Sequence, residues 1–257
     1  MRAVEIRDLT VRAGSATLIA GLTLDVEAGT WCTIVGPNGA GKTTLVETIV
    51  GLRRPVQGSV LIANEPVSEM SERDRALRVS FVPQHPIVPP GMSVRDYVAL
   101  GRTAYHGLLH PPSASDRRAV EDVLERLALG PFARRDVVTL SGGERQRMVL
   151  ARALAQGTMV MALDEPITGL DLRHQITTLE LLQHEVRASG LTVIATLHDL
   201  TLAGQFADRL ILIDHGRLLL DGPSGDVVRS RELEDCYGMK LRVIDVDGAD
   251  VVIPVRR

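Results

Sequence analysis

Residues 36–44 read Gly36-Pro37-Asn38-Gly39-Ala40-Gly41-Lys42-Thr43-Thr44, a glycine-rich run that ends in a lysine and two hydroxyl residues. Its first eight residues match the pattern G-x-x-x-x-G-K-[ST] without a gap. An apolar, β-branched run, Trp31 to Val35, comes directly before it, and a helical pattern, Lys42 to Val50, follows directly. Strand, glycine loop and helix in this order predict a phosphate-binding loop rather than an incidental βα turn.

The chemistry expected of this loop follows from its residue types. Glycines let the backbone curl so that several N–H groups point inward, and the start of the helix adds the positive end of its dipole. The amine of Lys42 is expected to reach the β- and γ-phosphates of the ligand. The hydroxyl of Thr43 is expected to bind Mg²⁺, which prefers oxygen ligands. We therefore predict a site for a polyphosphate with magnesium.

Two adjacent carboxylates form a second candidate site. Val160 to Leu163 are four apolar residues typical of a buried strand, and Asp164 and Glu165 follow them. Ligands of open α/β sheets bind at the carboxyl ends of the strands. We expect Asp164 to hold the magnesium ion, and Glu165, pointing elsewhere on an alternating strand, to act on water. Taken alone, the pair would also fit a solvated turn. The functional interpretation therefore depends on the glycine loop upstream.

The order of elements predicts an α/β fold. Strands are expected at 4–11, 22–26, 31–35, 59–62, 78–82, 159–163, 191–197 and 210–213, and helices at 42–50, 116–127, 143–154 and 172–188. Proline-rich breaks set off a helical insertion. We predict one domain over residues 1–257: a P-loop NTPase (RecA-like) core at 1–84 and 156–228 with a mainly parallel sheet and N-terminal antiparallel strands, a helical subdomain at 85–155, and a tail at 229–257 with a short helix and a strand pair.

Composition excludes several classes of function. The 257 residues are 45% hydrophobic and 24% charged, as in ordinary globular proteins. A net charge of −3 gives no bulk attraction to nucleic acid, so nucleic acid is not expected as a partner. No apolar run reaches the roughly 18 residues that a membrane span needs. The two cysteines, Cys32 and Cys236, show no metal-binding or disulfide spacing, which favours a reducing cytosol.

A third motif carries a resemblance to a known family. Leu140-Ser141-Gly142-Gly143-Glu144-Arg145-Gln146-Arg147 resembles the signature loop of the ATP-binding cassette (ABC) family. Ser141, Gly142 and Gly143 would open a helix and offer a hydroxyl and amides to an anion. The resemblance implies ATP as the ligand, with the loop meeting the γ-phosphate bound by the opposite subunit. One phosphate loop and one signature loop per chain then imply a head-to-tail homodimer around two ATP molecules.

Other elements of the family occur in the expected order over residues 1–228. The resemblance implies that Gln84 contacts magnesium or the attacking water, that Asp171 couples the two sites, and that His198 holds the γ-phosphate. It also implies ATPase activity, with Glu165 orienting or deprotonating water. Each of these residues alone would fit a helix cap or a satisfied polar side chain, but their common order favours the functional interpretation.

One departure from the family concerns the adenine base. Family members usually stack adenine on an aromatic residue at the place that Ala13 occupies here, and no Phe, Tyr, Trp or His occurs among residues 1–30. Arg12 could stack through its guanidinium group instead. The pattern predicts loose selectivity between ATP and GTP.

Three short stretches of sequence resemble the corresponding stretches of ABC importers of iron chelates, haem and cobalamin. Two lie before and after the helical insertion, Val82-Pro83-Gln84-His85 and Asp171-Leu172-Arg173-His174-Gln175, and the third, Cys236-Tyr237-Gly238-Met239, lies in the tail. The subgroup implies a transmembrane permease dimer, an extracytoplasmic substrate-binding protein and a peripheral position at the cytoplasmic face of the cell membrane. Transport of metal ions or other small solutes, transport in the opposite direction, and a soluble ATPase acting on DNA or ribosomes remain alternatives.

Overall fold

The structure, a computed structural model, describes residues 1–106 and 111–255. Its centre is a six-stranded sheet with the order β10-β9-β3-β8-β7-β6. Neighbours from β9 to β6 pair in parallel, and β10 pairs antiparallel with β9. The strands are β3 (Trp31–Val35), β6 (Val79–Val82), β7 (Val160–Asp164), β8 (Thr192–Thr196), β9 (Arg209–Asp214) and β10 (Arg217–Pro223).

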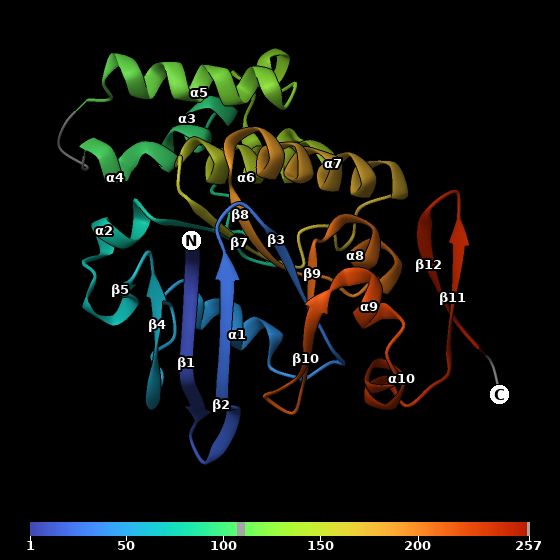
Figure 1. Cartoon of the computed structure of the whole chain (residues 1–257). Helices are drawn as coiled ribbons and strands as arrows, with labels where there is room; N and C mark the ends of the chain where they lie inside the picture. The colour runs from blue at the N-terminus through green and yellow to red at the C-terminus, as the bar shows by residue number, and fades with distance from the viewer. Residues whose placement is uncertain (107–110, 256–257) are drawn as a thin grey trace.

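A second, antiparallel sheet is formed by the N-terminal part of the chain and has the order β2-β1-β4-β5. Its strands are β1 (Arg2–Ala13), β2 (Ala16–Glu27), β4 (Gln57–Ile62) and β5 (Glu65–Pro66). The tail adds an isolated pair, β11 (Leu241–Val246) with β12 (Ala249–Pro254), which lies at the edge of the molecule beside α8 (Figure 1). A mainly parallel sheet with N-terminal antiparallel strands confirms the predicted fold class.

The helices fall into two groups. Between β6 and β7 the described chain contains α-helices and short 3₁₀ turns and gathers at one end of the molecule (Figure 1): α3 (Val94–Ala99), α4 (Thr103–His106), α5 (Ala114–Arg126) and α6 (Gly142–Ala155). The other helices are α1 (Lys42–Ile49), α2 (Glu72–Ala76), α7 (Leu172–Ser189), α8 (Leu200–Phe206), α9 (Ser224–Val228) and α10 (Arg231–Tyr237). In the described part of the chain, no helix has the length and apolar character that crossing a bilayer requires.

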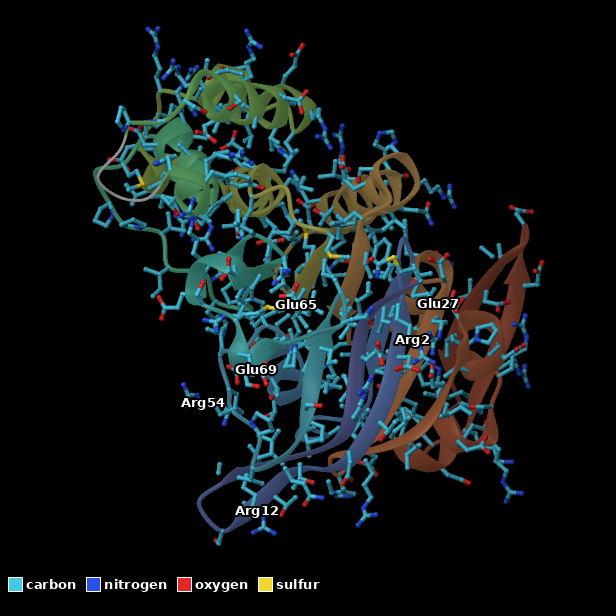
Figure 2. The ribbon with its side chains drawn as sticks, turned by 60° about the vertical axis from the view of Figure 1, so that its left-hand side comes forward. Arg2, Arg12, Glu27, Arg54, Glu65 and Glu69 are labelled. Carbon is cyan, nitrogen blue, oxygen red and sulfur yellow. The ribbon has the colours of Figure 1, made fainter. Side chains whose placement is uncertain are left out.

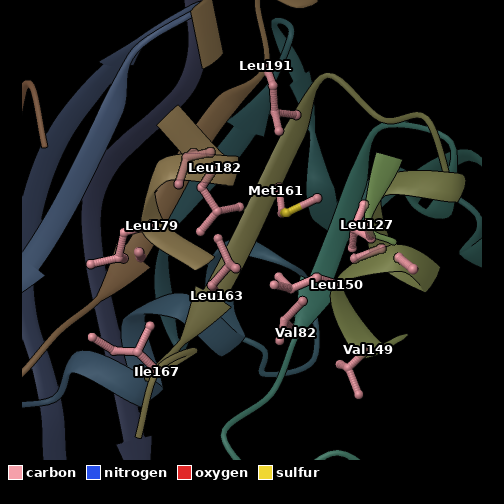
Figure 3. Packing of buried hydrophobic residues seen from close by; sticks show 14 of the residues in the cluster. Val82, Leu127, Val149, Leu150, Met161, Leu163, Ile167, Leu179, Leu182 and Leu191 are labelled. Atoms are coloured by element: carbon pink, nitrogen blue, oxygen red, sulfur yellow. The ribbon is translucent and has the colours of Figure 1, made fainter. Parts of the chain in front are cut away.

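The central strands are buried on both faces, which explains their continuous apolar runs. Along β7, Met161 and Leu163 join one hydrophobic cluster, while Val160 and Ala162 join another. Figure 3 shows Met161 and Leu163 between side chains of α6 and α7. Because successive side chains of a strand point to opposite faces, the sheet separates two cores and is held rigidly between them.

Element boundaries differ from the sequence expectations by a few residues, and most at β2. The pattern predicts a strand at 22–26, whereas β2 begins at Ala16. The strand is longer than predicted because β2 continues to pair with β1 as far as the partners Ala13 and Ala16. The register shifts near Gly21, whose φ of 62° interrupts the alternation of apolar and polar side chains along the strand. The short tail helix and the strand pair are confirmed as α10 and β11–β12.

Candidate nucleotide-binding and catalytic site

The glycine loop connects β3 to α1, as the sequence predicts. Gly41 directly precedes α1 with a φ of 103°, and a Cβ atom at this residue would lie 2.8 Å from the carbonyl oxygen of Leu18. A side chain is therefore excluded at this turn, both by conformation and by space. The loop thus brings its backbone directly to the start of a buried helix, where amides and the helix dipole favour an anion.

Lys42 lies inside the curve of the loop. Its Nζ donates hydrogen bonds to the carbonyl oxygens of Gly36 at 2.7 Å and Pro37 at 3.0 Å, and the residue is only 6% exposed. Burial lowers the pKa of Lys42, and the carboxylates of Glu165 and Asp164 partly offset this effect. A buried cation beside a glycine loop is suited to neutralise a polyphosphate.

The two carboxylates have different surroundings. Asp164 ends β7 and is buried, and its Oδ1 accepts a hydrogen bond from Thr196 Oγ1 at 2.7 Å. Thr196 also accepts a hydrogen bond from the backbone N–H of Glu165 at 2.8 Å. This threonine, on the neighbouring β8, thereby fixes both residues of the pair. Sequence reasoning missed it, since a threonine within a buried strand shows no pattern of its own.

Three side chains meet at the carboxylate of Glu165. Gln84 Nε2 donates to Oε2 at 2.6 Å, and Thr168 Oγ1 donates to the same oxygen at 3.0 Å. His198 Nε2 lies in hydrogen-bonding contact with Oε1. Gln84, Glu165 and His198 follow β6, β7 and β8, which are neighbours in the sheet, so the fold brings these three predicted site residues together.

The orientation of Glu165 has a different cause from the one expected. The sequence argument places it on an alternating strand, but β7 ends at Asp164 and Glu165 has a φ of 49°. A non-glycine residue in this left-handed conformation costs energy and needs surrounding contacts to persist. The contacts from Gln84, Thr168 and His198 provide them.

A cleft of about 370 Å³ lies between the glycine loop and the side chains of Glu165 and His198, whereas Asp164 and Gln84, the other predicted magnesium-binding residues, do not line it. It is lined by residues of β2, the glycine loop and the start of α1, the segments that follow β7 and β8, and the turn after β9: Thr17, Leu18, Asn38, Gly39, Gly41, Lys42, Thr43, Thr44, Glu165, His198 and His215. Arg12, the residue expected to stack on the base, is not among them and lies near the tip of the β1–β2 hairpin (Figure 2). The sequence gives no reason to single out His215, because its position beside the glycine loop depends on how distant segments pack.

The signature loop lies elsewhere in the chain. Ser141 caps α6: its hydroxyl accepts a hydrogen bond from the N–H of Glu144, and the carboxylate of Glu144 accepts one from the N–H of Ser141 at 2.8 Å. Ser141 and Gly142 are exposed. Neither they nor Gly143 and Asp171 line the cleft described above. Within one chain, the two predicted phosphate-contacting loops are therefore separate.

Asp171 and the signature helix are connected through His174. Asp171 caps α7, and its carboxylate contacts His174 Nδ1 at 2.8 Å. The hydrogen bond from the backbone N–H of His174 is the main cause that lowers the pKa of Asp171. The imidazole also packs on Gly143, where a Cβ atom would lie 2.4 Å from the ring. His174 thus links Asp171, at the start of α7, to the signature loop at the start of α6.

The donor set fits magnesium bound together with phosphates. Within residues 1–106 and 111–255, no group of three or more His, Cys, Asp or Glu side chains could hold a metal ion alone. Mg²⁺ in sites that bind nucleotides takes one or two protein oxygens and completes its shell with phosphate oxygens and water. Thr43 and Asp164 offer such oxygens. The residues present therefore fit magnesium that arrives with the nucleotide.

Comparison with known proteins agrees with this geometry. The model of the family described as ABC transporter matches residues 19–168, more than half of the chain. The chain belongs to the ABC transporter family. Its identification from the sequence as the ATP-hydrolysing subunit of such a transporter is thereby confirmed.

Relatives of known function cover almost the whole length of this ABC subunit. It is 36% identical to the ferric enterobactin transport ATP-binding protein FepC of Escherichia coli, over 97% of this chain and 93% of the relative. It is 38% identical to the hemin import ATP-binding protein HmuV of Bradyrhizobium diazoefficiens, over 98% of this chain and 94% of the relative.

Solved structures agree on the fold. An ABC transporter of metal-chelate type in an inward-facing conformation matches with a TM-score of 0.86 and 25% identity, over 99% of this chain and 98% of that one. A dimeric bacterial ABC transporter cassette matches with a TM-score of 0.77 and 26% identity, over 86% of this ABC subunit and 98% of that chain.

Proposed function

We propose that this ABC subunit hydrolyses ATP to power the uptake of an iron chelate, haem or cobalamin through a separate permease. The observation that carries the ATPase part is the meeting of Gln84, Glu165 and His198 at the end of the cleft that holds Lys42. The cargo class is supported by the relatives, whose names specify ferric enterobactin and hemin.

Hydrolysis in this site depends on positioning and charge. The amides of residues 36–44 and the amine of Lys42 would bind the phosphates, and Thr43 and Asp164 would hold magnesium, which would neutralise the developing charge. Glu165 would accept a proton from the attacking water or orient it. Gln84 and His198, which both contact Glu165, would fix its position and reach magnesium and the γ-phosphate respectively.

The base of the nucleotide would lie at the end of the cleft away from these catalytic side chains. Since Glu165 and His198 mark the γ-phosphate, the base would lie toward Thr17, Leu18 and His215. Of the two ring-bearing side chains that line the cleft, His198 is tied to Glu165, whereas the His215 side chain is 92% exposed at the turn. We infer that His215, rather than Arg12, takes the role of the missing aromatic residue.

A homodimer would complete each site. In the signature loop Ser141 and Gly142 are exposed and Gly143 is half-buried, and none of the three lines the cleft of its own chain. Two copies arranged head to tail would bring each signature loop to the γ-phosphate of the other copy, and Asp171 would couple the two sites. A dimeric cassette among the structural neighbours supports this arrangement.

The permease would dock over a second groove, of about 570 Å³, which lies where the chain enters the helical region. Its lining includes Pro83, next to Gln84, and two largely exposed apolar side chains, Leu52 at 63% and Ile87 at 88%. Apolar exposure of this kind typifies a protein contact. We propose that residues 85–155 act as the helical subdomain that receives the permease, at the cytoplasmic face of the membrane, and that an extracytoplasmic binding protein delivers the cargo.

The second candidate keeps the ATPase and changes the cargo to a metal ion or another small solute. The match to a metal-chelate type transporter favours chelates. Uptake of radiolabelled iron bound to hydroxamate, catecholate or haem carriers by cells that lack the gene tests the choice. Restoration by the wild-type gene, but not by a Glu165→Gln version, is expected for one of these chelates. Normal chelate uptake in the deleted strain would contradict the proposal.

A further inference from the structure

The C-terminal segment reaches the phosphate loop directly. Helix α10 ends at Tyr237, beside the loop between β3 and α1 (Figure 1). The hydroxyl oxygen of Tyr237 accepts a hydrogen bond from the backbone N–H of Gly36 at 3.1 Å, across 201 positions of the sequence. Gly36 is buried and Tyr237 packs against the main hydrophobic cluster. Burial raises the pKa of Tyr237 to about 12, so its hydroxyl stays neutral throughout the physiological range.

The residue that Tyr237 contacts through its N–H also holds the lysine through its carbonyl group. The carbonyl oxygen of Gly36 accepts a hydrogen bond from Lys42 Nζ at 2.7 Å. On its other side the residue is enclosed by β9, because a Cβ atom on Gly36 would lie 2.1 Å from the carbonyl oxygen of Ile213. Tyr237, Gly36 and Lys42 therefore form one connected chain of contacts from the tail to the phosphate-binding amine.

Tyr237 is itself held firmly. Ser230 caps the start of α10, and Gly238, with a φ of 63°, ends it. Leu233 is fully buried, and the N–H of Leu241 donates to the carboxylate of Glu234 at 2.8 Å. A short helix fixed at both ends and in the middle offers a rigid anchor for the hydroxyl group.

The tail is also fastened at a place remote from the loop. The hydroxyl of Thr201 on α8 accepts a hydrogen bond from the N–H of Val252 at 3.0 Å and donates one to its carbonyl oxygen at 3.3 Å. These two bonds hold β12 to the body of the protein without contacting the phosphate loop. Thr201 therefore offers a control for general loosening of the tail.

We propose that Tyr237 is a positioning residue of the nucleotide site: it holds the first peptide of the phosphate loop, and through Gly36 it places Lys42. The inference rests on the proposed binding of ATP and extends it, because it makes the C-terminal segment part of the site. A preorganised loop loses less conformational freedom on binding, which favours affinity.

The test compares two isosteric variants with the wild-type full-length protein. Tyr237→Phe removes only the hydroxyl group, and Thr201→Val removes the two hydrogen bonds between Thr201 and Val252. Tyr237→Phe is expected to raise the KM for ATP and the Kd for ADP about fivefold, the effect of one hydrogen bond, while kcat stays unchanged. Thr201→Val is expected to lower the melting temperature and to leave KM and Kd at the wild-type values.

An unchanged Kd for ADP in Tyr237→Phe would overturn the inference, and so would an equal rise of Kd in both variants, which would indicate general loosening. Failure of the wild-type protein to bind ATP would instead refute the proposed function itself.

Discussion

Replacement of Glu165 by glutamine removes the negative charge and the proton acceptor and keeps the shape of the side chain. The carboxylate is 11% exposed and has contacts with Gln84, Thr168 and His198. A positioned general base contributes about 10²- to 10⁴-fold to a rate, so turnover should fall by that factor, or about 3–5 kcal/mol in the barrier. ATP affinity should be retained, because Lys42 and the loop amides are untouched.

Because the variant binds ATP without turning it over, ATP should trap it as a dimer. The assays are steady-state phosphate release, nucleotide titration by calorimetry, and sedimentation with and without ATP. The matched control is Glu69→Gln, an exposed glutamate on the 3₁₀ turn at 67–69 (Figure 2) that does not line the cleft. Turnover of Glu165→Gln at the wild-type rate would refute the assignment of Glu165 as the group that acts on water.

Four further substitutions, and a comparison of ATP with GTP in the wild-type protein, test other parts of the account. Ser141→Ala should lower the stability of the protein by about 1 kcal/mol in denaturant titrations, through the lost helix cap, and should abolish ATPase activity while the monomer still binds nucleotide; full activity would contradict the role of the signature loop. His215→Ala should raise the KM for ATP about fivefold, the size of one stacking contact, whereas Arg12→Ala should have no effect; the reverse pattern would favour Arg12. In the wild-type protein, comparable turnover of ATP and GTP is expected, and strict ATP preference would contradict loose base selection. Hydrogen bonds from Ser113, together with Arg102, lower the pKa of Asp116 from 3.8 to about 2, so this carboxylate stabilises the fold by about 2 kcal/mol above pH 4 and loses that contribution as the pH falls toward 2. Asp116→Asn should therefore be less stable at pH 7 but not at pH 2, and an equal difference at both values would contradict the assignment.

The position of a site element could be predicted from the sequence wherever that element is built from consecutive residues. The glycine loop is one run between a strand and a helix, and its local pattern predicts both its conformation and its ligand. The meeting of Gln84, Glu165 and His198 was predictable in part, because carboxyl ends of parallel strands lie at one edge of a sheet. The central place of Glu165 among the three could not be predicted, because it depends on the strand order, in which β7 lies between β6 and β8.

Other parts of the site could not be predicted, because they depend on contacts between distant segments. The hydrogen bond between Gly36 and Tyr237 joins the loop to a tail whose role the sequence left open. The place of His215 in the cleft depends on how the β9–β10 turn packs on the loop, where the N–H of Gly216 donates to the carbonyl oxygen of Ala40 at 2.9 Å. Neither contact has a periodic or compositional pattern in the chain.

The most direct test of the central claim is the identity of the protein's partner in native membranes. The full-length chain, purified under gentle detergent, should bring down a polytopic permease in stoichiometric amount, and mass spectrometry should identify it as one of the chelate-importer type. ATP hydrolysis by that complex should rise when the cargo-loaded binding protein is added. Recovery of the chain without any membrane partner would leave its ATPase chemistry intact and contradict its role in transport.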